Sequence, residues 1–469
     1  MQSDQIQHLF TEYFAERGHQ AMASSSLVPP ADDATVLLTT AGMQQMTPFF
    51  LGLETPPAPR LTTIQKCFRT VDIDEVGDES HCTFFEMLGN FSVGDYYKQG
   101  AMEFAWELLT KVYGIDPQRL VVTIYPGEED TRQLWINAIG VEPRRIFIDP
   151  DCTWGPVGDS GPMGLNSEIY VDLGAHLGPD CFDGGADPTS SPRYLEVWNL
   201  VFMGLFQEKD GTRRELESKN IDTGMGLERI TMVLQGKESI YDTDLYMPII
   251  ERAAGIAGVT YRANADADRS LRVIADHSRA ISFLIADGVL PGNEGRGYVL
   301  RRILRRAVRH GRVLGIDRPF LTEVVETVVA RFGGRYPELT ARQGTIARIV
   351  LHEEEAFGRT LSAGITRFEA LAASTQAAGA TTVSGGEAFR LYHTYGFPFE
   401  LTAELARDAG LALDRAGFDA AMEEARSLSR QSAATFAGPG RSRLTLYSQA
   451  GVTSTFVGYD HVQSAATVW

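Results

Sequence analysis

The chain has 469 residues and a mass of 51.5 kDa, which is long enough for two to four domains and a sizeable buried core. Hydrophobic residues make up 43% and charged residues 22%, as in an ordinary soluble globular protein, while the formal net charge is −18 and the sequence pI is near 5.0. This acidic balance excludes a chain coated in cationic surface, so any nucleic-acid contact must use a local basic patch.

The first 240 residues predict a mixture of helices and strands. Ile6, Phe10 and Phe14 fall on one helical stripe behind a cap at Ser3 or Asp4, and residues 104–112 carry a second apolar stripe. Because strands and helices do not alternate strictly, we expect an antiparallel α+β domain over residues 1–240 rather than a doubly wound parallel one. The predicted strands are 36–38, 83–87, 120–125, 146–148, 169–173 and 197–203.

After about residue 240 the pattern becomes helical, and we expect a second, all-helical domain at 241–437. Gly438-Pro439-Gly440 predicts a linker, and a β-like run at 455–459 predicts a partial strand, so residues 438–469 form a third segment. The predicted helices are 269–287, 297–313, 321–332, 341–371, 398–409 and 416–431, with a loop at 372–386.

The cysteines and histidines predict no metal centre. No C-x-x-C pair and no H-x-x-x-H spacing occurs, which favours reduced thiols and no structural zinc. The sequence also lacks a basic-then-apolar leader and any run of 18 apolar residues, so we expect a cytoplasmic protein without a membrane segment. The four cysteines are Cys67, Cys82, Cys152 and Cys181.

Three local strings carry candidate chemistry. The string 222–229, Asp-Thr-Gly-Met-Gly-Leu-Glu-Arg, places two glycines before a helical run, where backbone can approach a ligand and Arg229 can reach a phosphate or a base. Residues 67–91 read as two strands around a loop that presents Arg69 and an exposed aromatic residue. The third string joins Trp154 to the Gly/Pro-rich 158–164 and Glu168. Taken singly, each also fits a structural role: a helix-start turn, a hairpin packed by aromatic residues and an irregular surface loop.

Together the three strings resemble class II aminoacyl-tRNA synthetases, which combine an antiparallel sheet, a hairpin arginine and a G-x-G-x-E-R turn at the ATP site. Within that class the sequence closely resembles the alanyl-tRNA synthetase family. The resemblance implies a class II antiparallel sheet with flanking helices as a catalytic (adenylation) domain, followed by a helical domain that recognises tRNA. The matching segments are 23–29, 40–43, 83–96, 104–109, 197–203, 222–229, 271–277, 283–288, 297–311 and 394–398.

The family resemblance implies ATP-dependent activation of L-alanine to alanyl-adenylate and its transfer to an acceptor. A carboxylate then attacks a phosphate, so the protein supplies cations and alignment and needs no side-chain nucleophile. In the implied roles Arg69 bridges the alanine carboxylate and the α-phosphate, Phe85 and Arg229 sandwich the adenine, and Mg²⁺ neutralises the β- and γ-phosphates. Asp222 takes the α-ammonium with Asn199 nearby, and Trp154, Val201 and Gly224 close a methyl-sized pocket. His81, Met87 and Gly226 complete the implied ATP site, and Arg69, Asp222 and Arg229 are the implied catalytic residues.

The window 296–312 contains a cluster of arginines and no Asp or Glu. On a helix these arginines make two adjacent stripes, and in an acidic chain they predict contacts to a phosphate backbone. A solvated helix, or arginines that buttress the catalytic domain, is the alternative. With Gly295 and Glu400, the expected acceptor-binding residues are Arg301, Arg302, Arg305, Arg306 and Arg309, and Arg312 ends the cluster.

The resemblance breaks at four places. The loop between Arg69 and His81 is short and acidic, and it lacks the lysine that the family's Gly-Gly-Lys-His-Asn-Asp loop directs to ATP or the acceptor end. Gly295 replaces an asparagine and Glu400 replaces an aspartate, the two residues with which the family reads the G·U pair of alanine tRNA. Fourth, the sequence stops in what resembles the first strand of the editing-side barrel (456–460), so we expect neither the editing domain nor the dimerisation region. As a separate expectation, we take the chain to be a monomer.

Three functional hypotheses follow. The first is a ligase that delivers alanine to the 3′ end of a tRNA, and the second is a stand-alone paralogue that alanylates a nucleoside-like small molecule, for example in antibiotic biosynthesis. The third is a non-catalytic alanine or RNA sensor. The intact Arg69, Asp222 and Arg229 favour an enzyme, whereas the changes at Gly295 and Glu400 leave the acceptor open.

Overall fold

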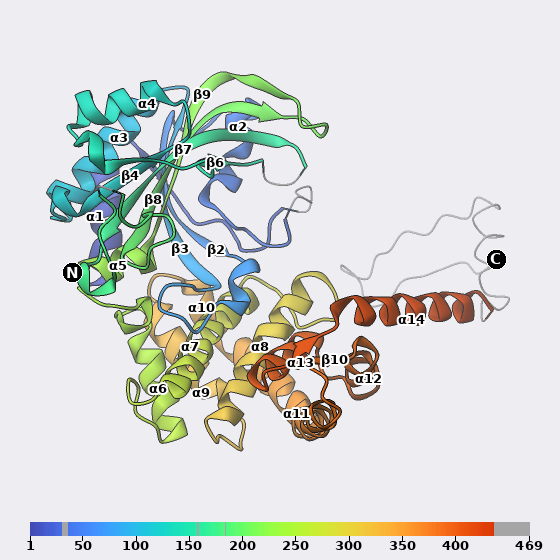
Figure 1. Cartoon of the computed structure of the whole chain (residues 1–469). Helices are drawn as coiled ribbons and strands as arrows, with labels where there is room; N and C mark the ends of the chain where they lie inside the picture. Colours follow the sequence, from blue (N-terminus) through green and yellow to red (C-terminus); the bar gives the residue numbers. More distant parts are fainter. Residues whose placement is uncertain (31–35, 157–158, 183, 436–469) are drawn as a thin grey trace, which may run out of the picture. The chain divides into compact units, whose positions relative to one another are not determined.

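The computed structural model describes residues 1–30, 36–156, 159–182 and 184–435 (Figure 1). The chain divides into two compact units, Met1–Gly358 and Arg359–Trp469. The first unit thus contains the sheet together with the first helices of the expected helical domain. The predicted linker at 438–440 and the partial strand at 455–459 lie outside the described residues. Among the described helices, none combines the length and the apolar character needed to cross a membrane.

A nine-stranded sheet forms the upper part of the first unit in Figure 1. Neighbouring strands in this sheet are antiparallel, except at its two edges, where the pairs β1–β2 and β4–β5 are parallel. The expected antiparallel α+β architecture is therefore confirmed, with parallel edges added. The strands run in the order β1 (Gln20–Met22), β2 (Arg60–Phe68), β3 (Phe84–Val93), β9 (Arg213–Gly226), β8 (Tyr194–Gln207), β7 (Gly161–Asp172), β4 (Leu120–Ile124) and β5 (Ile146–Ile148), and β6 (Thr153–Trp154) pairs with β7.

Two strand expectations differ from the structure. The predicted strand at 36–38 is wrong: these residues form a bend in which Leu38 is buried and Leu37 is exposed, so the apolar run reflects the burial of one side chain rather than pairing. The predicted strand 169–173 is the end of the longer β7, whose start at 161–164 is rich in Gly and Pro. Gly164 sits there because an added Cβ would lie 2.4 Å from the carbonyl oxygen of Phe202 on β8.

Helices cover the sheet, and the first of them does so with one apolar face. In the first helix, Ile6, Phe10 and Phe14 are fully buried, as the sequence predicts, and Phe10 lies 6.0 Å from Trp198 of β8 between ring centroids. The sheet-covering helices are α1 (Ser3–Ala15), α2 (Thr47–Phe50), α3 (Lys98–Glu107), α4 (Glu129–Leu134) and α5 (Leu227–Leu234).

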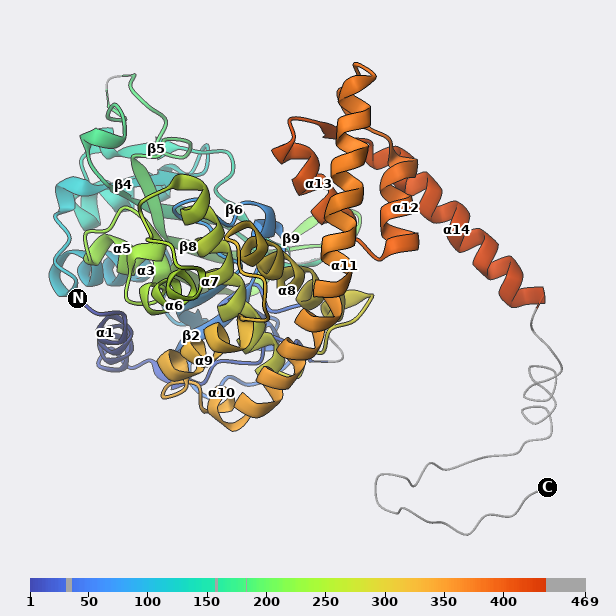
Figure 2. The ribbon, with the colours of Figure 1, turned by 90° about the horizontal axis from the view of Figure 1, so that it is seen from below.

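A second group of helices packs beneath the sheet within the first unit (Figure 2). The central one is α7 (Ala265–Ala286), which is buried from Ser270 to Ala286 on every face. It therefore has to pair its own polar side chains inside the protein. The other helices of the group are α6 (Met247–Ala257), α8 (Gly295–Val313), α9 (Leu321–Phe332) and α10 (Pro337–Ala341), and α11 (Gln343–Ala377) begins in the first unit.

The second unit has a small core of Ala388, Phe399 and Phe418. Part of the predicted loop 372–386 is wrong, because α11 continues to Ala377 through alanines, which favour helix. The helix α12 (Gly385–Tyr395) is missed because two glycines open it; Ser384 caps it through the amide N–H of Glu387. The remaining elements are α13 (Phe399–Asp408), α14 (Arg415–Thr435) and the pair β10 (Thr382–Val383) and β11 (Ala412–Leu413).

Candidate active site

A cavity of about 620 Å³ lies on one face of the central strands. Since side chains alternate between the faces of a strand, every second residue of β3, β8 and β9 can line it. The register then sets neighbours opposite one another: Val201 pairs with Asp222, and Asn199 pairs with Gly224. The lining residues of these strands are Phe85, Met87, Val197, Asn199, Val201, Asp222, Gly224 and Gly226.

The structure brings every residue predicted for ATP or alanine to this one cavity, although they come from five different strands and helices and from the loop between β2 and β3. The sequence separates the first and last of them by 160 positions, yet the sheet order β2–β3–β9–β8–β7 makes them neighbours. They are Arg69, His81, Phe85, Met87, Trp154, Asn199, Val201, Asp222, Gly224, Gly226 and Arg229.

Asp222 is the buried acid of the cavity. Its side chain is nearly inaccessible, and burial raises the pKa of the carboxyl to about 7. Next to it in the sheet, Asn199 donates from Nδ2 to Oε1 of Glu168 at 3.0 Å. Among the described residues, Oδ1 of Asn199 has no hydrogen-bond partner. The pair therefore offers two acceptors, a carboxylate and an amide oxygen, to a ligand that donates hydrogen bonds.

Glu168 and Glu196 line the cavity but were not among the predicted binding residues. Glu168 is fixed by the hydroxyl of Tyr170 at 2.6 Å and by Nδ2 of Asn166 at 3.1 Å, and burial together with the charge of Glu196 raises its pKa to about 7. The sequence string from Trp154 to Glu168 already pointed to Glu168. Alternation along β8 could not have pointed to Glu196, because a register shift in that strand brings Glu196 and its neighbour Val197 to the cavity together.

Two arginines supply the positive charge of the cavity. The guanidinium of Arg69 lies 4.9 Å from the ring centroid of Phe85, and its Nε is 3.4 Å from the carbonyl oxygen of Thr40. Arg229 forms an ion pair with Glu196, Nη1 to Oε2 at 3.0 Å. The arginine that lies over Phe85 here is thus Arg69, whereas Arg229 was expected to share the adenine with Phe85.

An apolar corner adjoins Asp222. Met87, Val201 and Trp154 pack together in one hydrophobic cluster, and a Cβ added to Gly224 would lie 2.8 Å from Sδ of Met87. Only glycine therefore fits at position 224 without displacing Met87.

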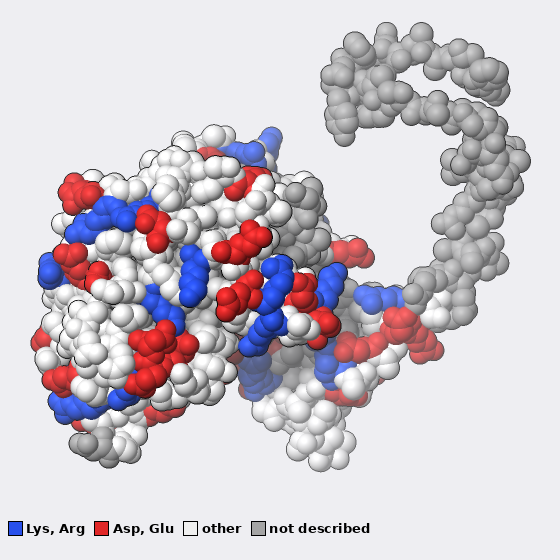
Figure 3. Space-filling view, turned by 90° about the horizontal axis from the view of Figure 1, so that it is seen from above, with Lys and Arg blue, Asp and Glu red and all other residues white. Residues whose placement is uncertain are grey.

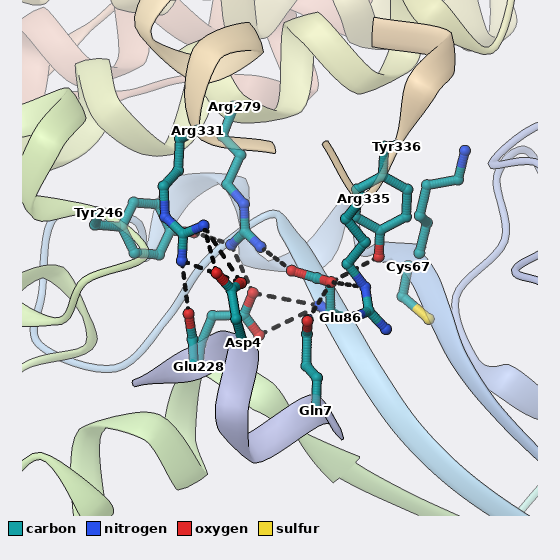
Figure 4. Close-up of polar contacts among 12 residues, drawn as sticks. Asp4, Gln7, Cys67, Glu86, Glu228, Tyr246, Arg279, Arg331, Arg335 and Tyr336 are labelled. Carbon is teal, nitrogen blue, oxygen red and sulfur yellow. Dashed lines mark hydrogen bonds and ion pairs between the residues drawn. The ribbon is translucent and has the colours of Figure 1, made fainter. Parts of the chain in front are cut away.

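A buried charge network lies beside the cavity (Figure 4). Arg279 of α7 donates from Nη1 to Glu228 at 2.5 Å and from Nη2 to Glu86 at 2.8 Å, and all three side chains are buried. Glu86 also accepts from Tyr336 at 2.6 Å and from Gln7 at 2.7 Å. Burial raises the pKa of Glu228 to about 7. The network joins α7 to β3 and to α5, the two elements that carry Phe85 and Arg229.

More of the arginines in α8 form ion pairs with carboxylates than the sequence suggests. Arg301 and Arg305 share Glu353 at 3.1 and 2.9 Å, and Arg302 pairs with Asp74 at 2.7 Å. These carboxylates lie 52, 48 and 228 positions away, so a window limited to 296–312 cannot show them. On the face drawn in Figure 3, basic and acidic side chains are likewise interspersed.

For two arginines of this cluster, the expected contact with the acceptor has to be corrected. Arg306 and Arg309 are buried, and Arg306 contacts Nε2 of His277 at 3.1 Å and the carbonyl oxygen of Val76 at 3.3 Å. Buried guanidinium groups cannot meet a phosphate backbone in this conformation, so the alternative of buttressing fits these two residues. Arg301, Arg302 and Arg305 are half-buried, and Arg312 pairs with Asp317.

The two expected base-pair readers lie in different units. Gly295 opens α8 with a φ of +55°, and no atom lies within 4 Å of a Cβ added there. Its neighbour Arg296 donates from Nε to the carbonyl oxygen of Leu37 at 2.6 Å, in the segment that continues to Thr40 at the cavity. Glu400 lies in α13 of the second unit.

One group in the described chain has the composition of a metal site. Ligand atoms of Asp149, Cys152 and Glu168 lie within 4.8 Å of one another. Burial raises the pKa of the Cys152 thiol to about 12, and its Sγ contacts the hydroxyl of Thr123 at 3.1 Å. A thiol held in its protonated form is a poor zinc ligand, and the expectation that no zinc binds stays a prediction.

The sequence matches the family described as "tRNA synthetases class II (A)" over residues 5–469. The chain belongs to this family. Among curated proteins, this class II chain is 44% identical to the alanine–tRNA ligase of Dehalococcoides mccartyi over 99% of its length and 53% of that protein. It is 46% identical to the alanine–tRNA ligase of Rubrobacter xylanophilus, over 100% of this chain and 54% of the other. The chain spans about half the length of the curated relatives it matches.

Two matching solved structures share much less sequence with this chain. The apo histidyl-tRNA synthetase of S. aureus matches with a TM-score of 0.31 and 12% identity, over 51% of this chain and 67% of that one. A pyrrolysyl-tRNA synthetase from Desulfitobacterium hafniense matches with a TM-score of 0.30 and 11% identity, over 52% and 72%. Scores this low carry no weight for the site of this class II chain.

Proposed function

We propose that the chain activates L-alanine with ATP to form alanyl-adenylate and transfers the alanyl group to the 3′ end of a tRNA. The observation that carries the proposal is the joint placement of Asp222 and Asn199 beside the apolar corner of Trp154, Val201 and Gly224. A carboxylate that can bind an ammonium group, next to an apolar corner that can take one methyl group, suits alanine. Arg69 and Arg229 line the same cavity, where they can bind the alanine carboxylate and the phosphates of ATP.

In the proposed reaction the alanine carboxylate attacks the α-phosphate of ATP, and pyrophosphate leaves. Arg69 holds the carboxylate and the phosphate together by its planar guanidinium, which lowers the repulsion between the two anions. Asp222, when ionised, binds the α-ammonium, with Oδ1 of Asn199 as a second acceptor. Class II synthetases in general use Mg²⁺, and the carboxylates of Glu168 and Glu196 give the oxygen ligands that this ion prefers. When bound, the ion neutralises phosphate charge.

The identity of the relatives favours tRNA as the acceptor. The nucleoside-like small molecule, a role in antibiotic biosynthesis and the non-catalytic sensor gain no support from the comparisons. For the acceptor we propose contacts with Arg301, Arg302, Arg305 and Gly295 of the first unit, and separately with Glu400 of the second unit. We also propose that the chain acts as a cytoplasmic monomer with the adenylation function in residues 1–240 and acceptor recognition in residues 241–437.

The test is alanine-dependent exchange of labelled pyrophosphate into ATP by the purified chain, with Mg²⁺ and without RNA. We expect exchange with alanine, and with serine and glycine at roughly a hundredth of its efficiency, because one methyl or hydroxyl group gives little discrimination. Absence of exchange with alanine would contradict the proposed enzyme. Discrimination against serine and glycine beyond about ten-thousandfold would show that the pocket is not the one described.

A further inference from the structure

The loop between β2 and β3, residues 69–83, is acidic and contributes residues to the cavity. Residues 70–83 include five carboxylates and neither lysine nor arginine, so His81 is the residue of this loop that can carry positive charge. His81 lines the cavity that also holds Arg69 and Arg229. Apart from Arg69, which opens the loop, the cation that this loop can offer to a triphosphate is therefore the imidazolium of His81.

His81 is held by one carboxylate. Asp78 contacts Nδ1 of His81 through Oδ2 at 2.5 Å, and its Oδ1 accepts from the amide N–H groups of His81 at 2.8 Å and Ser80 at 3.0 Å. With Nδ1 engaged, the ring is oriented, and among the described residues no hydrogen bond is made to Nε2. An imidazole in this arrangement presents Nε2–H to a ligand in the cavity.

Asp78 is itself anchored from α7. Arg272 is buried and donates from Nη1 to the carbonyl oxygens of Gly77 at 3.2 Å and Asp78 at 3.1 Å, and to the carboxylate of Glu79 at 2.9 Å. On the other side of the pair, Tyr241 donates to the carbonyl oxygen of His81 at 2.7 Å. The backbone on both sides of the Asp78–His81 pair is thus fixed by buried groups, which makes the pair a built feature rather than a loose surface contact.

The charges around His81 come from two elements. Asp78 and Asp72 belong to its own loop, and Arg229 comes from α5. The hydrogen bond to Asp78 is the largest influence and raises the pKa of His81, while burial and the charge of Arg229 act in the opposite direction. The neighbouring Cys82 stays a neutral thiol because burial raises its pKa.

We propose that Asp78 is a positioning residue that keeps the His81 imidazole oriented and charged, so that Nε2–H donates to a phosphate oxygen of ATP. The proposal rests on the proposed function in taking ATP as the ligand of this cavity. His81 is the binding group, and Asp78 acts through it.

The test measures Mg·ATP binding by calorimetry, without alanine, between pH 6 and pH 9. In the wild type we expect affinity to fall about tenfold as pH rises through the raised pKa of His81, because one charge-assisted hydrogen bond is lost. Asp78→Asn should move the midpoint of this fall to lower pH. His81→Gln should remove the fall, and in that background Asp78→Asn should have no further effect. Glu75→Gln removes one exposed carboxylate of the same loop and should leave the midpoint where it is.

A second readout is independent of ATP. Nuclear magnetic resonance of ring-labelled histidine, assigned by His81→Gln, should show the His81 pKa above 6.5 in the wild type and lower in Asp78→Asn. An unchanged His81 pKa in Asp78→Asn, or independent effects of the two substitutions on ATP affinity, would overturn the proposal. A chain that behaves as expected here but gives no alanine-dependent exchange would leave the pair standing and refute alanine activation instead.

Discussion

Arg279 of α7 and Glu228 of α5 meet inside the protein, with Nη1 and Oε1 2.5 Å apart and both side chains inaccessible to solvent. Glu228 immediately precedes Arg229, and Arg279 also holds Glu86, one residue from Phe85. The helices beneath the sheet therefore fix the elements that carry two proposed ATP contacts. Removal of the arginine leaves two buried carboxylates without their cation.

We expect Arg279→Met to lower the free energy of unfolding by about 3–5 kcal/mol. The folded-state pKa of Glu228 is already raised, so its protonated form favours folding at low pH and this stabilisation is lost as pH rises through about 7. Without Arg279 this pH-dependent loss of stability should grow, so the variant's free energy of unfolding should fall further below that of the wild type at pH 8 than at pH 6. Urea unfolding at the two pH values measures it. Arg318→Met, which removes an exposed ion pair with Glu323, should cost less than about 1 kcal/mol; equal costs would contradict the interpretation.

Asp222→Asn should lower kcat/KM for alanine in pyrophosphate exchange by an amount equivalent to roughly 2–4 kcal/mol, because the ammonium loses its charged partner. In the wild type only the ionised Asp222 binds the ammonium. Since burial raises its pKa to about 7, kcat/KM should rise with pH through that value. The Asn variant should lack this rise while still binding ATP. A variant that keeps the rise would assign the titration to another group, such as Glu168.

Gly224→Ala should reduce alanine activation through KM, because the new Cβ would lie 2.8 Å from Sδ of Met87 and push that side chain into the apolar corner. Gly226→Ala offers a comparison two residues along the same strand face, where the nearest atoms are those of Arg229 at 3.9 Å. Its effect should appear in the KM for ATP. Equal effects of both variants on the KM for alanine would show that the corner around Gly224 does not hold the methyl group.

Asp74→Asn should raise the affinity of the chain for tRNA several-fold at low salt, because Arg302 is released from its ion pair and becomes available to a phosphate. Glu75→Gln removes a charge of the same sign from the adjacent position and should raise the affinity less. Fluorescence titration over a range of salt concentrations measures both. The same increase in both variants would mean that only the overall charge of the loop matters.

Gly295→Asn should be tolerated by the fold, because asparagine adopts positive φ more readily than other side chains and no atom lies within 4 Å of the added Cβ. In the wild type we expect exchange of the G·U pair for G·C in an alanine tRNA to change aminoacylation less than about tenfold, since glycine has no side chain with which to read a base edge. The Asn variant should discriminate better, by about 1–3 kcal/mol. Strong discrimination by the wild type would show that other residues read the pair.

The amino-acid sequence by itself determined the local elements and the chemistry of the cavity. Apolar periodicity located α1 and α9, and the string 222–229 predicted a glycine turn before a helix, which is the junction of β9 and α5. The family resemblance named the cavity residues, from Arg69 to Arg229. These signals are local or depend on residue type, so they survive without knowledge of the fold.

Only the tertiary structure decided what the charges do. The arginines of α8 look unpaired within 296–312, but Glu353 and Asp74 reach them from other segments, and packing buries Arg306 and Arg309. The register shift that brings Glu196 to the cavity and the contact of Arg272 with the loop of His81 likewise depend on pairing between distant segments. Electrostatic partners are chosen by distance in space, and distances across 200 residues are set by the packing of the whole unit rather than by any sequence window.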